Sequence, residues 1–149
     1  MRIFSLAVAV AMAALCAAPA LACEGGQCPV AAQAAGAPAR PPKPIPDQEP
    51  EVTLQVRTML LEYAEGKVAP ERYTERAGAA LFPGPAKQLE ACLRGFGALD
   101  TLQLLERKTD GEDRQYRYRA LYRNAAALVD ITFNKAGRVS RFSVCAVKS

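Results

Sequence analysis

The sequence predicts an α+β fold in which three helices are followed by a four-stranded antiparallel meander. Apolar residues recur at helical spacing from Glu51 to Phe96, and after Gly97 apolar and polar residues alternate. Turn-forming residues then separate four alternating runs at hairpin spacing. The roughly 100 residues of this region are enough to enclose one modest hydrophobic core.

Residues 1–22 are expected to be a secretory signal peptide. Arg2 precedes an unbroken apolar run from Ile3 to Ala18, and Ala20-Leu21-Ala22 matches a small-x-small cleavage site. The mature chain should therefore begin at Cys23, in the periplasm or outside the cell, and carry no transmembrane segment. A lipid anchor on Cys23 is the alternative, although Ala stands three residues before this cysteine, where a lipoprotein signal usually has Leu.

Residues 23–50 are expected to form a flexible tether. This segment consists largely of Ala, Gly, Gln and Pro, and prolines crowd its end, so it cannot bury a core. Residues 51–149 then form the single predicted domain.

The first two helices are predicted from apolar periodicity and from residues that begin or end helices. Gly66 should end the first helix, and Pro70 suits the first position of a second, shorter helix. The second helix should end before Phe82-Pro83, because a helix does not continue through this sequence. The first helix carries its apolar stripe at Val52, Val56, Met59, Leu60 and Tyr63.

The third helix should open at Pro85 and be closed by Gly95 and Gly97. Its apolar face comprises Leu89, Cys92, Leu93 and Phe96.

Four strands are predicted from alternation and from turn residues such as Asp110-Gly111 and Asn124. With the second turn at Asn124, Tyr118 should face Ile131 and Arg119 should face Asp130. Carrying the register forward also places Arg141 opposite Asp130. The first hairpin does not register cleanly, so we expect a β-bulge there. The strands should span Thr101–Lys108, Arg114–Tyr122, Ala126–Phe133 and Val139–Val147.

Alternation gives the predicted sheet one apolar, aromatic face and one basic face around a single carboxylate, Asp130. The apolar face is either core or the lining of a pocket for a small apolar ligand. The basic face is either a solvated surface or a docking surface for an anionic partner. The candidate pocket residues are Tyr116, Tyr118, Ile131, Phe133 and Phe142. The candidate partner-binding residues are Arg117, Arg119, Arg123 and Arg141.

Four cysteines remain after removal of the signal, an even number in an oxidising compartment. A Cys92–Cys145 disulfide would tie the third helix to the last strand, with Cys23 and Cys28 closing a small loop in the tether. Alternation opposes the first bridge, because it places Cys145 on the basic face while Cys92 lies on the core face of its helix.

Three segments carry a resemblance to a known superfamily. They are Leu93-Arg94-Gly95-Phe96-Gly97-Ala98-Leu99, Gln115-Tyr116-Arg117-Tyr118-Arg119-Ala120-Leu121-Tyr122, and the run from Val129 through Asn134-Lys135-Ala136-Gly137 to Val139. With the preceding helices, this pattern resembles the NTF2-like (cystatin-like) α+β superfamily, and in particular the small domains attached to exported serine hydrolases of the β-lactamase type. The resemblance implies a sheet wrapped by helices that serves as a ligand pocket or docking surface. The Ser-x-x-Lys motif of the hydrolases themselves is absent.

Enzymatic activity is not expected. The chain contains no histidine, which removes the commonest general base and nearly all zinc constellations, and it has no glycine-rich phosphate loop. Asp130 and Tyr118 are the best candidates for proton transfer, as in an NTF2-like isomerase or lyase, but alternation places them on opposite faces. No cofactor or metal is predicted, and nucleic acid is a poor partner for an exported chain without aromatics interleaved on its basic face.

The sequence therefore predicts an exported, non-catalytic protein that binds a partner protein of the cell envelope, such as a hydrolase, through the basic face of its sheet. A carrier of a small apolar ligand is the alternative.

Overall fold

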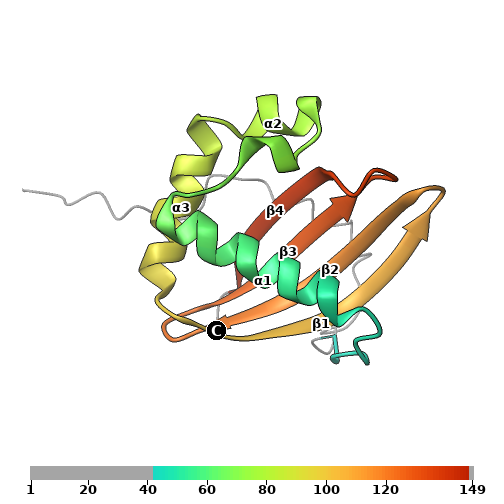
Figure 1. Cartoon of the computed structure of the whole chain (residues 1–149). Helices are drawn as coiled ribbons and strands as arrows, with labels where there is room; N and C mark the ends of the chain where they lie inside the picture. Colours follow the sequence, from blue (N-terminus) through green and yellow to red (C-terminus); the bar gives the residue numbers. More distant parts are fainter. Residues whose placement is uncertain (1–41, 148–149) are drawn as a thin grey trace, which may run out of the picture.

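The computed structural model describes residues 42–147 of the 149-residue chain. Within this range an α+β fold is formed, with three helices followed by an antiparallel meander of strand order β1-β2-β3-β4 (Figure 1). The predicted signal peptide, its cleavage at Cys23 and most of the predicted tether lie outside the described residues. No helix within the described range is long and apolar enough to cross a membrane.

Helix α1 (Pro50–Glu65) ends at the predicted glycine. Gly66 adopts a left-handed backbone conformation (φ 70°), and its N–H donates to the carbonyl of Tyr63. Glycine adopts this conformation without the steric cost of a Cβ. The five residues of the predicted apolar stripe are all buried and place α1 against the sheet.

The second predicted helix divides into two pieces. A 3₁₀ turn (Pro70–Arg72) is followed by extended residues, and α2 (Glu75–Leu81) begins only after Thr74, whose side-chain oxygen accepts from the N–H of Ala77. The predicted continuous helix from Pro70 is therefore wrong. Tyr73 forms a parallel bridge with Val139, and the Thr74 N–H donates to the Val139 carbonyl, so this segment is held extended at the β4 edge.

Helix α3 (Gly84–Phe96) packs against α1 and ends at Gly97, as predicted, whereas Gly95 lies inside the helix. Leu93 is fully buried, while Cys92 is half-buried. Cys92 and Cys145 are each disulfide-bonded. Cys145 lies opposite Leu128, in register with the polar side of the sheet. The Cys92–Cys145 pairing stays a prediction.

The four strands are β1 (Leu99–Asp110), β2 (Asp113–Tyr122), β3 (Ala126–Phe133) and β4 (Val139–Val147). The irregularity predicted in the first hairpin is confirmed: the β1–β2 register shifts between Leu104 and Glu106, and again near Leu99. A further shift between β3 and β4 leaves Ser140 as an extra residue immediately before Arg141.

The predicted register of the central strands is wrong by two residues. Tyr122 donates its N–H to the Ala125 carbonyl, so the turn is formed by Arg123 and Asn124 rather than by the residues that follow. Tyr116, not Tyr118, consequently lies opposite Ile131. A shift of two residues preserves the side of the sheet on which each side chain lies, so the predicted division into two faces is confirmed.

Candidate binding site

The aromatic face of the sheet is covered by α1. The predicted pocket residues Tyr116, Tyr118, Ile131, Phe133 and Phe142 are all brought together there, and each is at least 93% buried. Phe142 stacks on Tyr63 with 5.1 Å between ring centroids. The Tyr118 hydroxyl lies 3.1 Å from the Thr53 hydroxyl. These contacts with α1 make the five residues part of the hydrophobic core.

A carboxylate at the start of α1 joins the helix to the first hairpin. Glu49 accepts a 2.7 Å hydrogen bond from the Tyr116 hydroxyl and forms an ion pair of 2.8 Å with Arg107. Arg114 approaches the same carboxylate at 3.9 Å. Burial, followed by the hydrogen bond to Glu49, raises the pKa of Tyr116. Glu49 therefore has a structural role and is not available to a ligand.

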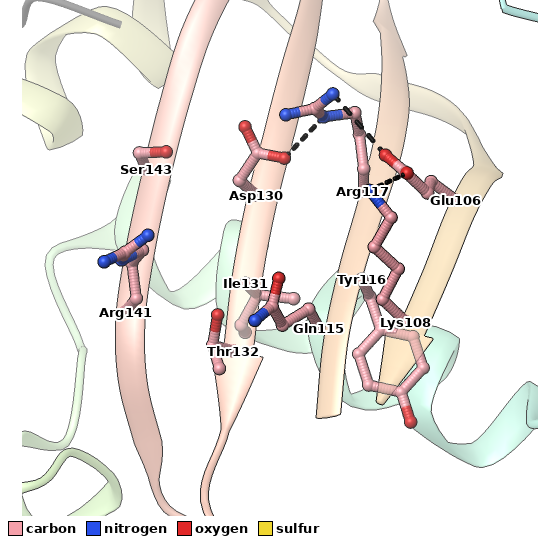
Figure 2. A pocket seen from close by; sticks show the side chains of 10 residues that line it. All are labelled: Glu106, Lys108, Gln115, Tyr116, Arg117, Asp130, Ile131, Thr132, Arg141 and Ser143. Carbon is pink, nitrogen blue, oxygen red and sulfur yellow. Dashed lines mark hydrogen bonds and ion pairs between the residues drawn. The ribbon is translucent and has the colours of Figure 1, made fainter. Parts of the chain in front are cut away.

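The opposite side of the sheet, here called the open face, carries a pocket of about 280 Å³. Side chains from all four strands surround it, and the helices lie behind the sheet in this view (Figure 2). Its lining includes three cationic side chains and two carboxylates. The lining residues are Glu106, Lys108, Gln115, Tyr116, Arg117, Asp130, Ile131, Thr132, Arg141 and Ser143. Among them, Tyr116 and Ile131 have their side chains in the core on the covered face.

Two neighbouring cross-strand rows supply most of this lining. The first, the carboxylate row, runs across the four strands as Glu106, Arg117, Asp130 and Ser143. Arg117 Nε lies 2.6 Å from Asp130 Oδ1, and Arg117 Nη1 lies 3.6 Å from Glu106 Oε2. The hydrogen bond to Asp130 raises the pKa of Arg117 above its already high ordinary value. With two carboxylates and one guanidinium, this row keeps a net charge of −1.

The second row, the cation row, runs as Lys108, Gln115, Thr132 and Arg141. Lys108 Nζ contacts Glu106 of the adjacent row at 2.5 Å. Arg141 is exposed and makes no hydrogen bond or ion pair with any of residues 42–147. The extra residue Ser140 directly precedes Arg141, and a β-bulge of this kind reorients the neighbouring side chain. Arg141 thus presents an unpaired cation at the edge of the pocket.

The four predicted partner-binding arginines do not act as one cluster. Arg117 is held by Asp130, and Arg119 donates to the Pro42 carbonyl at 3.3 Å. Arg123 lies exposed in the β2–β3 turn. Only Arg117 and Arg141 line the pocket.

The predicted partners of Asp130 require correction. Arg117, rather than Arg119, lies opposite this carboxylate on β2, and Ser143, rather than Arg141, lies opposite it on β4. The different turn position accounts for the first change. The expectation that Asp130 forms a structural ion pair is confirmed, and Tyr118 lies on the other face of the sheet.

Sequence reasoning missed Lys108, Gln115, Thr132 and Ser143 as members of this site. Alternation places Gln115, Thr132 and Ser143 on the polar side of the sheet, whereas the register shift between Leu104 and Glu106 brings Lys108 to that side. A turn centred on Arg123-Asn124 would have paired Gln115 with Thr132, but the rows also require the register shift in β1 and the β3–β4 register.

A second pocket, of about 180 Å³, lies between the end of α1 and the start of α3. Its acidic residue Glu90 is already paired with Arg94 at 2.7 Å. The lining residues are Tyr63, Gly66, Val68, Phe82, Pro83, Ala86, Lys87 and Glu90.

No group of three or more acidic or cysteine side chains within residues 42–147 is arranged to hold a metal ion. Comparison of the chain with models of protein families, with curated proteins and with solved structures finds no match.

Proposed function

We propose that this protein is an exported, non-enzymatic binding module that docks an anionic segment of a cell-envelope protein on the open face of its sheet. The observation that carries the proposal is the unpaired Arg141 beside a pocket that no described helix covers. An exposed cation at a concave polar surface favours association with a negatively charged partner.

Membership of the NTF2-like superfamily forms part of this proposal. Three helices preceding a four-stranded meander support it, together with the quoted sequence resemblance. The resemblance implies that an envelope hydrolase is one class of partner. Export rests on the apolar N-terminal segment and its small-x-small site.

The burial of the aromatic residues makes a carrier function the weaker alternative. Tyr63 and the other apolar residues of α1 fill the space that an apolar ligand would occupy above Phe142. A ligand there would have to displace the helix from the sheet.

Affinity capture from the envelope fraction of the source organism tests the proposal. We expect the wild-type protein to retain a partner that is released by salt, because screening weakens interactions between exposed charges. Arg141→Glu should lose this partner, whereas Arg138→Glu, which makes the same charge change in the β3–β4 turn, should retain it.

Circular dichroism should show that both variants remain folded. Equal recovery of every partner by the wild type and Arg141→Glu would contradict docking at the open face. A native protein found only in the cytoplasm by cell fractionation would contradict export.

A further inference from the structure

The chemistry of the two rows indicates which kind of anion the open face accepts. The carboxylate row places Glu106 and Asp130 beside the cation row, so one side of the pocket repels dense negative charge. A polyanion such as nucleic acid or polyphosphate would bring charges against both rows. Sparse, separated carboxylates can contact the cation row alone.

The uncharged residues of the cation row favour a peptide ligand, whose side chains would supply those carboxylates. Gln115 and Thr132 lie between the two cationic ends of the row. Their amide and hydroxyl groups supply both donors and acceptors, which match the N–H and C=O groups of a peptide backbone. Lys108 has three N–H donors, so its contact with Glu106 leaves others for a ligand.

The spacing of the cationic ends sets the spacing of the acidic residues. Three steps between neighbouring strands separate Lys108 on β1 from Arg141 on β4, which corresponds to about 14 Å between their backbones. Residues i and i+4 of an extended peptide point to the same side and are separated by about 13 Å.

From this match we propose that the cation row binds an extended acidic peptide whose two carboxylate side chains are four residues apart, one at Lys108 and the other at Arg141. The peptide crosses the strands and lies over Gln115 and Thr132. This inference rests on the proposed function and specifies the partner segment that the open face recognises.

Equilibrium titration with fluorescent peptides of equal composition tests the spacing. One peptide carries Glu at positions one and five of a Gly/Ser background, and its isomer carries the two Glu side by side. At low ionic strength we expect the spaced peptide to bind about threefold more tightly than its isomer. A difference of this size corresponds to the free energy of one additional exposed ion pair. The fluorophore is uncharged, and a peptide without Glu serves as the blank.

Variants identify the residues that discriminate between the spaced peptide and its isomer. Lys108→Gln and Arg141→Gln should each weaken the spaced peptide about threefold and abolish the preference over the isomer. Arg138→Gln removes a nearby exposed charge outside the pocket and should leave both unchanged.

Three results would overturn the inference in distinguishable ways. Equal binding of the two peptides, or equal weakening by Arg138→Gln, would reject the cation row while leaving docking at the open face intact. Tighter binding of polyphosphate than of either peptide would reject the peptide as the ligand. If no anionic probe binds and Arg141→Glu still captures every partner, both this inference and the proposed function fail.

Discussion

The two faces of the sheet predict very different costs for removing Asp130 and Tyr118. Tyr118 is fully buried, so Tyr118→Ala removes an aromatic ring from the core and should cost about 4 kcal/mol of the free energy of unfolding. Asp130 pairs with Arg117, but their side chains are 29% and 39% exposed. Water therefore hydrates Arg117 in Asp130→Ala, and we expect a cost of only about 0.5–1 kcal/mol.

Urea denaturation followed by circular dichroism measures both costs. Tyr118→Phe is the matched control, because it keeps the ring and loses only the contact with the Thr53 hydroxyl, for an expected cost of about 1 kcal/mol. A cost for Asp130→Ala that equals that of Tyr118→Ala would refute the assignment of the two faces. It would show that the open face contributes to stability as much as the core.

Three further measurements test other parts of the fold. Burial raises the pKa of all five tyrosines, that of Tyr118 to about 12. The tyrosines of the unfolded chain therefore ionise at a lower pH than those of the folded protein, which favours unfolding. The free energy of unfolding should hold up to pH 10 and fall as the pH rises towards 12. An ultraviolet titration of the folded protein that shows tyrosinate forming at pH 10 would contradict this. Glu49→Ala should lower the free energy of unfolding by about 1.5 kcal/mol in urea denaturation, because it removes the partner of the Tyr116 hydroxyl and of Arg107. The control Glu51→Ala, at an exposed position, should change it by less than about 0.5 kcal/mol. Gly66→Ala should lower stability by about 1 kcal/mol, because φ is +70° and the added Cβ would lie 3.0 Å from Glu90. Gly95→Ala, inside α3 with open space around it, should raise stability by about 0.5 kcal/mol. A reversed order of the two variants in thermal melts would contradict this account of the backbone.

Helix and strand identities could be predicted where a local pattern decides them. The apolar period of α1 and the glycine that ends it are both local features, and the alternation of β2 and β3 assigns each side chain to a face. The break at Tyr73 could not be predicted in this way. It depends on pairing with Val139, which lies far along the chain.

The candidate site depends on register, which local pattern specifies less well. Turns at Arg123-Asn124 and at Asn124-Ala125 give the same two faces but different cross-strand rows. The sequence therefore indicates a polar face, and the structure is needed to pair Arg117 with Asp130 and to leave Arg141 unpaired.

Chemical-shift mapping tests the central claim, that the open face binds acidic segments, most directly. In nuclear magnetic resonance spectra of the isotopically labelled protein, addition of the spaced acidic peptide should shift the backbone amide signals of Lys108, Gln115, Thr132 and Arg141 most strongly. Added salt should reverse these shifts. Shifts concentrated in α1 and α3, or in the tyrosines of the covered face, would contradict the account.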